Sequence, residues 1–245
     1  LTFQPHFKNE DHSLMMMLRG QLTSGNSTTQ STTEYGLPSG SIKSSGAPAI
    51  PSFSMSNGQW RSIYLTYSAH YAYKGKYMAD FSIRAGGTTK FGPERRWGYF
   101  PAVSLRWNII DEPWMQWAKG GERNVLSMLS IRPSWGRVGN QPGGNYLYAS
   151  KYGTAATYLD MNAMYPVNIR LNNLKWQINP SYNLGVDLGF WNDRLTVVIE
   201  GYRSTVTNML MNNYRIPSNS GFSTIAVRNT GKMRNIGWEF HINTN

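Results

Sequence analysis

The 245-residue sequence contains no cysteine, which excludes disulfide bonds and thiolate metal sites. It also lacks any apolar run near the roughly 18 residues that a membrane-spanning helix needs, since its longest helix-like apolar run covers only residues 14–18. Charged residues are scarce at 15%, whereas hydrophobic residues make up 40% and aromatic residues 13%. A helical membrane protein is therefore excluded, and the abundance of aromatic side chains needs another explanation.

The chain is basic, with a net charge of +11, and a nucleic-acid partner has to be considered. The basic residues are spread over the whole sequence and form no run of five or six. Basic side chains lining strands and loops explain this distribution better, and we expect no nucleic-acid partner.

Segments in which apolar and polar residues alternate recur along the chain, and the hairpin 62–86 is the best example. Its apolar positions are Ile63, Leu65, Tyr67, Ala69, Tyr71 and Tyr73, then, after a turn at 74–76, Tyr77, Ala79, Phe81, Ile83 and Ala85. The opposite face includes Asp80 and Arg84. A charged side chain facing lipid at mid-depth costs about 2–4 kcal/mol, so these two residues are predicted to face the interior of a barrel.

The connections between these segments alternate in length. We predict short turns at 8–11, 74–76 and 191–193, a longer turn at 111–125, and long loops at 24–59, 87–98, 138–178 and 207–232. This order is typical of a transmembrane β-barrel, whereas a soluble β-sandwich has no reason to segregate its loops by length. About nine strands are predicted, which is too few for the large plugged barrels of about 22 strands.

The two ends of the sequence suggest an internal piece of a longer chain. Residues 1–7 are predicted to be a strand rather than a signal peptide, and the sequence stops at Asn245 without a closing aromatic residue. We therefore expect further strands to come from elsewhere in the parent chain, because an open sheet edge is not viable in lipid.

Several ordered motifs between residues 60 and 240 resemble one family, the SusC-like TonB-dependent outer-membrane transporters of Bacteroidetes. The motifs are Lys76-Tyr77, 82–84 (Ser-Ile-Arg), 90–93 (Lys-Phe-Gly-Pro), 96–104 (Arg-Trp-Gly-Tyr-Phe-Pro-Ala-Val-Ser), 112–115 (Glu-Pro-Trp-Met), 131–136 with 139–141, 174–176, 183–187, 192–195, Gly221-Phe222 and 229–239. Pro133 and Trp114 stand where other residues are commoner in the family.

The resemblance implies that residues 1–245 are part of one all-β, antiparallel barrel domain of a 22-stranded transporter in the outer membrane of a Gram-negative Bacteroidetes cell. It implies import of bulky nutrients, either oligosaccharides or peptides, with a SusD-like surface lipoprotein and with energy from TonB-ExbB-ExbD. The plug domain, the TonB box and the final strands are absent from this sequence. No enzymatic activity and no cofactor are implied. The alternatives are a small passive outer-membrane pore or adhesin, and a soluble glycan-binding β-sandwich.

Residues that often carry catalysis or bind metal give only weak signals. His6, His12, His70 and His241 lack metal-ligand spacing and have no carboxylate partner predicted in register, so we expect neither a metal site nor a catalytic site there. Asp111 and Glu112 are adjacent, and a solvated turn is the preferred interpretation over acid–base catalysis.

The long loops contain candidate binding residues. Aromatic rings and guanidinium groups can hold sugars or peptides at the mouth of a pore. The candidates for substrate or partner contact are Arg95, Arg96, Trp97, Tyr146, Tyr148, Tyr152 and Tyr158. Packing between the loops is the alternative role for these residues.

Overall fold

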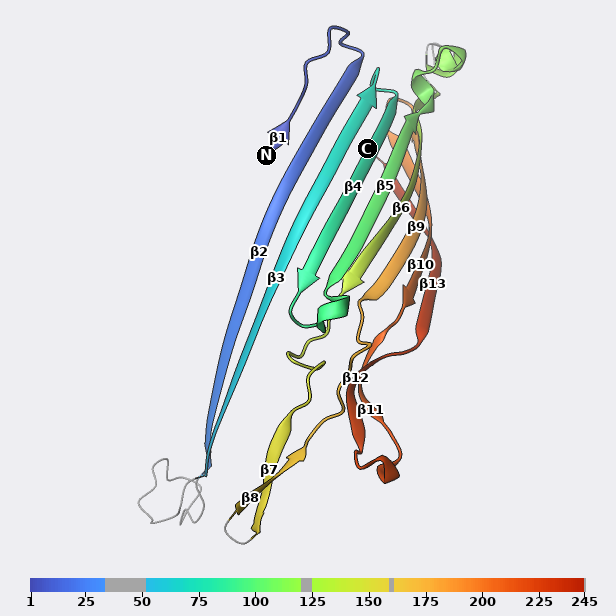
Figure 1. Cartoon of the computed structure of the whole chain (residues 1–245). Coiled ribbons are helices and arrows are strands. Elements are labelled where there is room, and N and C mark those ends of the chain that lie inside the picture. The colour runs from blue at the N-terminus through green and yellow to red at the C-terminus, as the bar shows by residue number, and fades with distance from the viewer. Residues whose placement is uncertain (34–51, 120–124, 159–160, 245) are drawn as a thin grey trace, which may run out of the picture.

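The computed structural model describes residues 1–33, 52–119, 125–158 and 161–244. Nine antiparallel strands form one curved sheet in the order β1-β2-β3-β4-β5-β6-β9-β10-β13 (Figure 1). Their bounds are β1 (Thr2–Phe3), β2 (His12–Thr33), β3 (Ser52–Tyr73), β4 (Tyr77–Thr88), β5 (Trp97–Asn108), β6 (Leu126–Asn140), β9 (Gln177–Phe190), β10 (Leu195–Thr207) and β13 (Lys232–Thr244). The predicted all-β class and the nine strands of the sheet are confirmed.

The connections of the sheet lie at two opposite ends, which we call the turn end and the loop end (Figure 1). The turn end carries residues 8–11, 74–76 and 191–194, together with η2 (Ile109–Asp111), η3 (Pro113–Met115) and α1 (Gln116–Lys119). The loop end carries η1 (Pro93–Arg95), the hairpin of β7 (Tyr152–Tyr158) with β8 (Met161–Pro166), β11 (Leu210–Arg215), η4 (Ser218–Ser220) and β12 (Thr224–Asn229). The predicted alternation of short and long connections therefore holds.

Within the described residues, none of the helices combines the length and the hydrophobicity required to span a bilayer.

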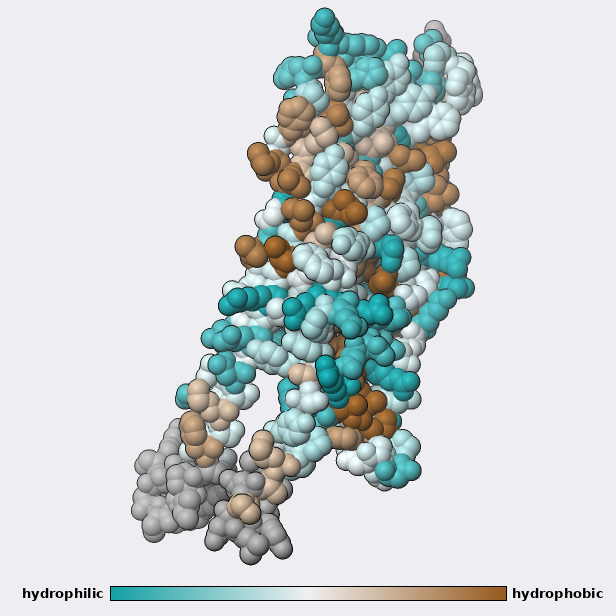
Figure 2. Space-filling view, in the orientation of Figure 1, coloured by the Kyte–Doolittle hydropathy of each residue, from teal (hydrophilic) through white to brown (hydrophobic). Residues whose placement is uncertain are grey.

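One face of the sheet is apolar, and strand register makes it continuous. A row of seven residues paired from strand to strand runs across it, namely Tyr73, Tyr77, Trp107, Ile131, Val186, Ile199 and Phe240. Many of the apolar side chains on this face are exposed, including Leu65, Leu105 and Phe240 at 51%, 48% and 69%. The space-filling view shows a band of hydrophobic residues across the strands, between hydrophilic residues at the turn end and a hydrophilic zone toward the loops (Figure 2). We call this the apolar face.

The opposite face, which we call the polar face, follows from the alternation of side chains along each strand. One row of residues on this face is also paired from strand to strand, namely Met15, His70, Asp80, Ser104, Ser134, Asn183, Tyr202 and Gly237. Asp80 and Arg84 lie on this face, as the sequence predicts. Met15 and Met17 also lie on it, beside His70 and Ser68, which explains why the pattern is weaker in residues 12–22.

The hairpin of β2 and β3 is longer than predicted. Residues 24–59 were expected to be a loop, but β2 continues to Thr33 and β3 begins at Ser52. Serine, threonine, asparagine and glutamine dominate this extension. Phe53 and Met55 continue the alternation at the start of β3, but residues 24–33 of β2 contain no apolar side chain and so give no alternating signal. Backbone pairing, together with the strand preference of threonine, continues the ladder where the pattern of side chains ends.

Glycines paired with aromatic residues tighten the contact between neighbouring strands. Gly201 is paired with Trp238 and Gly237 with Tyr202, so the two rings lie over glycines on opposite faces of β10 and β13. Tyr64 with Gly86 and Trp97 with Gly87 repeat the arrangement between other strands. Each ring occupies the space that the glycine leaves, which strengthens these pairs.

Candidate functional site

A small hydrophobic core joins the segments at the loop end. Its buried members, which we call the loop-end cluster, are Phe91, Phe100, Leu174, Trp176 and Val227. The Trp176 ring lies at its centre, 4.9 Å from the Phe91 ring and 5.3 Å from the Phe100 ring. These residues come from four separate stretches of sequence, so the cluster holds the loops against the end of the barrel wall.

Hydrogen bonds reinforce this packing. The Asn229 side chain accepts a bond from the Lys175 backbone N–H at 2.8 Å and donates to the carbonyl oxygens of Lys175 and Asn208 at 2.7 and 2.9 Å. Trp176 Nε1 donates to the Arg96 carbonyl oxygen at 3.3 Å. The loop end is therefore anchored by backbone contacts that sequence patterns do not reveal.

Lys90 connects two of the loops. Its Nζ donates to the carbonyl oxygens of Pro142 and Gly143 at 3.2 and 3.3 Å, and it lies 5.1 Å from the centre of the Trp60 ring. Burial lowers the pKa of the Lys90 ammonium because the charged form loses hydration.

The candidate residues at positions 95–97 lie in different environments. Arg95 is exposed in η1. Arg96 is half-buried, and its Nε is a buried atom with no hydrogen-bond partner in the described part of the chain. Trp97 is 56% exposed on the apolar face, over Gly87. The structure thus directs Trp97 away from the polar face.

The candidate tyrosines are also dispersed. Tyr148 is half-buried beside Gly92, Tyr146 is 38% exposed with a positive φ of 57°, and Tyr152 is 63% exposed on β7. Tyr158 pairs with Met161 through the backbone, and its side chain lies outside the described structure. Among the described side chains, no ring contact or hydrogen bond joins two of the seven candidates.

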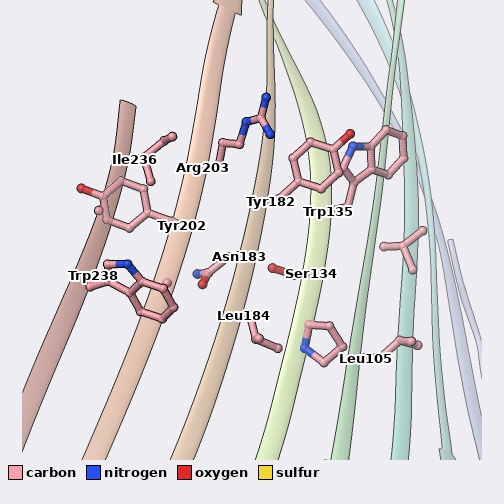
Figure 3. A pocket seen from close by; sticks show the side chains of 14 residues that line it. Leu105, Ser134, Trp135, Tyr182, Asn183, Leu184, Tyr202, Arg203, Ile236 and Trp238 are labelled. Atoms are coloured by element: carbon pink, nitrogen blue, oxygen red, sulfur yellow. The ribbon is translucent and has the colours of Figure 1, made fainter. Parts of the chain in front are cut away.

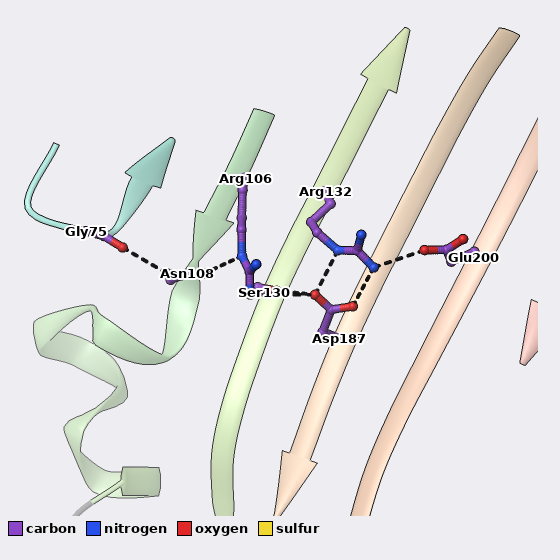
Figure 4. A network of polar contacts seen from close by, with 7 residues as sticks. All are labelled: Gly75, Arg106, Asn108, Ser130, Arg132, Asp187 and Glu200. Carbon is purple, nitrogen blue, oxygen red and sulfur yellow. Dashed lines mark hydrogen bonds and ion pairs between the residues drawn. The ribbon is translucent and has the colours of Figure 1, made fainter. Parts of the chain in front are cut away.

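A network of charged side chains crosses the polar face toward the turn end (Figure 4). Arg132 donates from Nε to Asp187 Oδ2 at 2.8 Å and from Nη2 to Asp187 Oδ1 at 2.7 Å, and Nη2 also reaches Glu200 Oε1 at 3.0 Å. Ser130 Oγ donates to the same carboxylate at 2.8 Å, and Arg106 lies 3.9 Å from it. This network ties β6, β9 and β10 together and leaves the Arg132 charge compensated.

His70 corrects one expectation from the sequence. No carboxylate was predicted in register with a histidine, yet His70 and Asp80 are paired across β3 and β4, with Nδ1 2.6 Å from Oδ1. Ser104 donates to the other carboxylate oxygen at 3.1 Å. The hairpin turn at 74–76 sets this register. In the described residues, no group of three or more metal-ligating side chains could hold a metal ion.

Glu112 is a second correction, since its turn was expected to be solvated. The carboxylate is buried, accepting hydrogen bonds from the hydroxyl of Tyr77 and, at 3.1 Å, from Trp107 Nε1. Lys76 Nζ lies 3.8 Å from its other oxygen. The bonds from Tyr77 and then Trp107 hold the pKa of Glu112 below its ordinary value of 4.5. These contacts with Tyr77, Trp107 and Lys76 hold the turn against the ends of the strands.

A groove on the apolar face crosses β5, β6, β9, β10 and β13 (Figure 3). Its walls include Leu105, Trp135, Tyr182, Leu184, Ile236 and Trp238, and Gly201 lies in its floor. Such a surface suits the acyl chains of lipid.

A hollow on the polar face, near the loop end, contains residues that sequence reasoning missed. It encloses about 380 Å³ and is lined by Arg84, Arg137, Asn140 and Gln141, with Tyr64, Phe100 and Trp176 as its aromatic part. The Arg84 guanidinium carbon lies 4.0 Å from the centre of the Tyr64 ring. The polar alternation 80–84 signals that Arg84 faces inward, whereas the register of β6 places Arg137 in line with Trp135 on the apolar face.

An antiparallel sheet with one lipid-compatible face, one polar face and connections segregated by length defines the wall of an outer-membrane β-barrel. Comparison with known proteins identifies its family. The sequence model of the family described as TonB dependent receptor-like, beta-barrel matches residues 4–245, and the chain belongs to this family. It therefore lies in the bacterial outer membrane, with its apolar face on lipid. Proteins of this family are transporters and not enzymes.

Curated relatives and solved structures agree with this assignment. The chain is 35% identical over 172 residues to the TonB-dependent receptor P39 of Formosa agariphila, with 70% of the chain and 16% of the relative covered. It is 33% identical over 184 residues to the TonB-dependent receptor SusC of Bacteroides thetaiotaomicron, with 71% of the chain and 17% of the relative covered. The chain thus spans about one sixth of the length of these relatives.

Among solved structures, the fold resembles the RagAB peptide importer in its closed-closed state, with a TM-score of 0.84, 20% identity and coverage of 99% of this chain and 26% of that chain. It also resembles the E. coli K12 ferric-catecholate import receptor Fiu, with a TM-score of 0.56, 12% identity and coverage of 100% and 34%. These likenesses establish the fold. The SusC-like resemblance of the sequence motifs is confirmed by the relatives.

Proposed function

We propose that this chain is part of the barrel wall of a SusC-like transporter that imports bulky nutrients, either oligosaccharides or peptides. The observation that supports the proposal most directly is the continuous pairing of an apolar row and a polar row from β3 to β13. Such a wall seals against lipid on one side and offers hydrogen-bonding groups to a solute on the other.

The whole protein would work with partners. A SusD-like surface lipoprotein would cover the loop end, and TonB-ExbB-ExbD would supply energy through a plug domain and a TonB box outside these 245 residues. The structurally similar RagAB is a peptide importer, which favours peptides as one substrate class. Further strands of the same parent chain would complete a 22-stranded barrel.

The loop end would meet the substrate or the lipoprotein. Arg95, Tyr146 and Tyr152 offer exposed side chains for such contacts, and Tyr158 belongs to the same loop. Arg96 and Tyr148 are half-buried, so they would pack against other loop residues as well as contact the substrate or the lipoprotein. Trp97, on the apolar face, would sit at the membrane interface, where tryptophan is enriched.

The test is uptake by the organism that encodes the full-length protein. Deleting the gene should abolish uptake of one labelled class, either oligosaccharides or peptides, while uptake of the matching monomers persists. Deleting TonB should give the same loss. Uptake that continues at the wild-type rate without TonB would indicate a passive pore instead. A detergent-free, monodisperse full-length protein would indicate a soluble glycan-binding domain.

A further inference from the structure

Lysine and arginine side chains on the apolar face are confined to the half of the strands next to the loops. Alternation along the strands places five of them there, namely Arg61, Arg137, Arg203, Lys232 and Arg234. The acidic residues of the described strands all belong to the polar face, namely Asp80, Asp187, Glu200 and Glu239. The charge on the lipid side of the described strands is therefore positive, and it lies only toward the loop end.

These basic residues lie where the apolar stretch of a strand ends. Arg61 comes two positions after Ile63 toward the loop end of β3, and Arg234 has the same relation to Ile236 on β13. The long loops of outer-membrane barrels are extracellular, so this level of the wall meets the outer leaflet. A long basic side chain there can keep its stem on apolar surface while its charged head reaches the lipid headgroups. Lipids that carry phosphate offer the opposite charge.

One of these arginines, Arg61, lines a second groove on the apolar face, which we call the Arg61 groove. It encloses about 630 Å³, and its apolar part is a row paired across β2, β3, β4 and β5, namely Leu22, Ile63, Gly87 and Trp97. Gly87 lies in the floor, because a Cβ added there would lie 3.2 Å from the Trp97 ring and 3.3 Å from Ile63 Cγ2. Leu22, Ile63 and Trp97 are 82%, 44% and 56% exposed, so the groove presents apolar surface on which an acyl chain can lie.

Polar groups line the loop end of the Arg61 groove. Arg61 is exposed, and within the described part of the chain its guanidinium has no hydrogen bond or ion pair. Thr89 Oγ1 accepts a hydrogen bond from the Arg61 backbone N–H at 2.9 Å, which leaves the Thr89 hydroxyl hydrogen available to a ligand. Ser24 is paired with Arg61 and lines the same groove, as does Arg96. The polar end of the groove therefore offers hydrogen-bond donors with positive charge.

This combination matches a lipid with a phosphate headgroup. Phosphate oxygens accept parallel hydrogen bonds from a guanidinium group, and the hydroxyls of Ser24 and Thr89 can donate to the same group. Charge decides between this occupant and other apolar ones. An uncharged transmembrane segment would cover the apolar row but leave Arg61 without a counter-charge. A second copy of this face would bring only further basic side chains of the described strands to it.

We infer that the Arg61 groove binds one phosphorylated lipid of the outer leaflet. An acyl chain lies along Leu22, Ile63 and Trp97, and the phosphate meets the Arg61 guanidinium. A lipid held in this way is part of the seal between the barrel wall and the outer leaflet. The inference depends on the apolar face lying on lipid and not on the identity of the solute, so it goes beyond the proposed transport function.

The test measures lipid binding to the purified full-length protein in detergent by native mass spectrometry, which separates the free protein from protein with one or more bound lipids. The two probes are lipid A with its phosphate groups and the same lipid A after enzymatic dephosphorylation. We expect the first molecule of the phosphorylated form to bind at least about 10-fold more tightly than the first molecule of the dephosphorylated form. Inorganic phosphate at the same concentration as the lipid should not displace it, because phosphate alone gains nothing from the apolar row.

Variants assign that preference to the groove. Arg61→Gln should weaken binding of the phosphorylated form about 10-fold and change binding of the dephosphorylated form less than about 2-fold. Arg61→Lys should lose only part of the affinity, because an ammonium keeps the charge without the planar fork. Leu22→Asn should weaken both forms by a similar factor, since it removes apolar contact. The control is Arg19→Gln, which removes the same charge from the polar face of β2 and should leave both affinities unchanged.

Four results would overturn the inference. The wild type could bind both forms of lipid A equally, or the preference could survive unchanged in Arg61→Gln, which would place the phosphate elsewhere. Arg19→Gln could have the same effect as Arg61→Gln, which would indicate a general charge effect. A wild-type dimer in the same spectra that becomes a monomer in Leu22→Asn would assign the groove to a second copy of the protein. None of these results bears on TonB-dependent uptake, so failure of the inference is distinct from failure of the proposed transport function.

Discussion

Arg132 and Asp187 form a two-pronged ion pair across β6 and β9, with nitrogen–oxygen distances of 2.8 and 2.7 Å. The Arg132 guanidinium also binds Glu200 on β10. To reach it, the side chain crosses Gly185, the β9 residue that is paired with both Arg132 and Glu200. A Cβ added at Gly185 would lie 3.2 Å from Arg132 Nη2, so the glycine gives the guanidinium room to cross a whole strand. On the polar face, β6, β9 and β10 are therefore held together by ion pairs between side chains as well as by backbone hydrogen bonds.

Replacing Asp187 with asparagine tests the contribution of this ion pair. The variant removes a charged acceptor from Arg132 and Ser130, and we expect the free energy of unfolding to fall by about 1.5–3 kcal/mol. Urea unfolding of the full-length protein in detergent micelles, followed by tryptophan fluorescence, measures the change. Arg19→Gln is the matched control and should change the free energy by less than about 0.5 kcal/mol. Equal stability of D187N and the wild type would contradict a role for the network in holding the strands.

The glycine–aromatic pairs give a second prediction. A Cβ at Gly201 would lie 2.7 Å from Trp238 Cζ3, whereas a Cβ at Gly20 would have no atom within 4 Å. Gly201→Ala should therefore lower the free energy of unfolding by about 1–3 kcal/mol, through displacement of the Trp238 ring. Gly20→Ala, on the same apolar face, should be neutral or slightly stabilising. The same unfolding assay compares the two, and a loss in Gly20→Ala as large as in Gly201→Ala would contradict the packing argument.

Trp176 is predicted to control the order of the loop end rather than the stability of the barrel. Trp176→Ala removes the central ring of the loop-end cluster, a change that typically costs about 3–5 kcal/mol where a ring is buried. Because the strands keep their own pairing, the loss should appear as faster amide hydrogen exchange near Phe91, Leu174 and Val227, with unchanged exchange in β9 and β10. Trp114→Ala, which removes a ring that is 59% exposed at the turn end, is the control. Uniformly faster exchange would indicate that the cluster is not a separate unit.

Glu112 makes the turn end sensitive to acid. Its pKa in the folded protein lies below 4.5 because Tyr77 and Trp107 donate hydrogen bonds to the charged form. The stability that it contributes is therefore fully present above the unfolded-state pKa, and it is lost as the pH falls through the lower folded-state pKa. Wild-type stability should drop below about pH 4.5, and the Glu112→Gln variant should show a smaller drop over this range. Identical pH profiles for the two proteins, measured by thermal unfolding, would contradict the assignment.

Strand positions within the membrane were predictable from the sequence because lipid on one side and water on the other impose a strict alternation. The pattern located β3, β4, β5 and β9 and placed Asp80 and Arg84 on the polar face. Beyond the membrane both faces meet water, and the signal vanishes, so the extension of β2 to Thr33 was missed. The hairpins β7–β8 and β11–β12 were missed for the same reason.

The candidate binding residues were less predictable. Abundance of tyrosine and arginine in loops pointed to the right end of the molecule but could not distinguish exposed Arg95 from half-buried Arg96. The His70–Asp80 pair and the stacking of Arg84 on Tyr64 depend on how neighbouring strands are paired. Neither property is encoded in the spacing of residues along a single strand.

The orientation of the two faces is the central claim, and adjacent residues of β5 test it most directly. Because these 245 residues contain no cysteine, Leu105→Cys and Ser104→Cys each introduce one thiol here, for spin labelling of a full-length protein with any other cysteines replaced. The measurement is the collision of each label with oxygen, which concentrates in lipid, and with a water-soluble nickel chelate. We predict that the label at 105 collides mainly with oxygen and the label at 104 mainly with the chelate. The reverse pattern, or equal exposure of both labels to the chelate, would contradict a barrel wall with its apolar face on lipid.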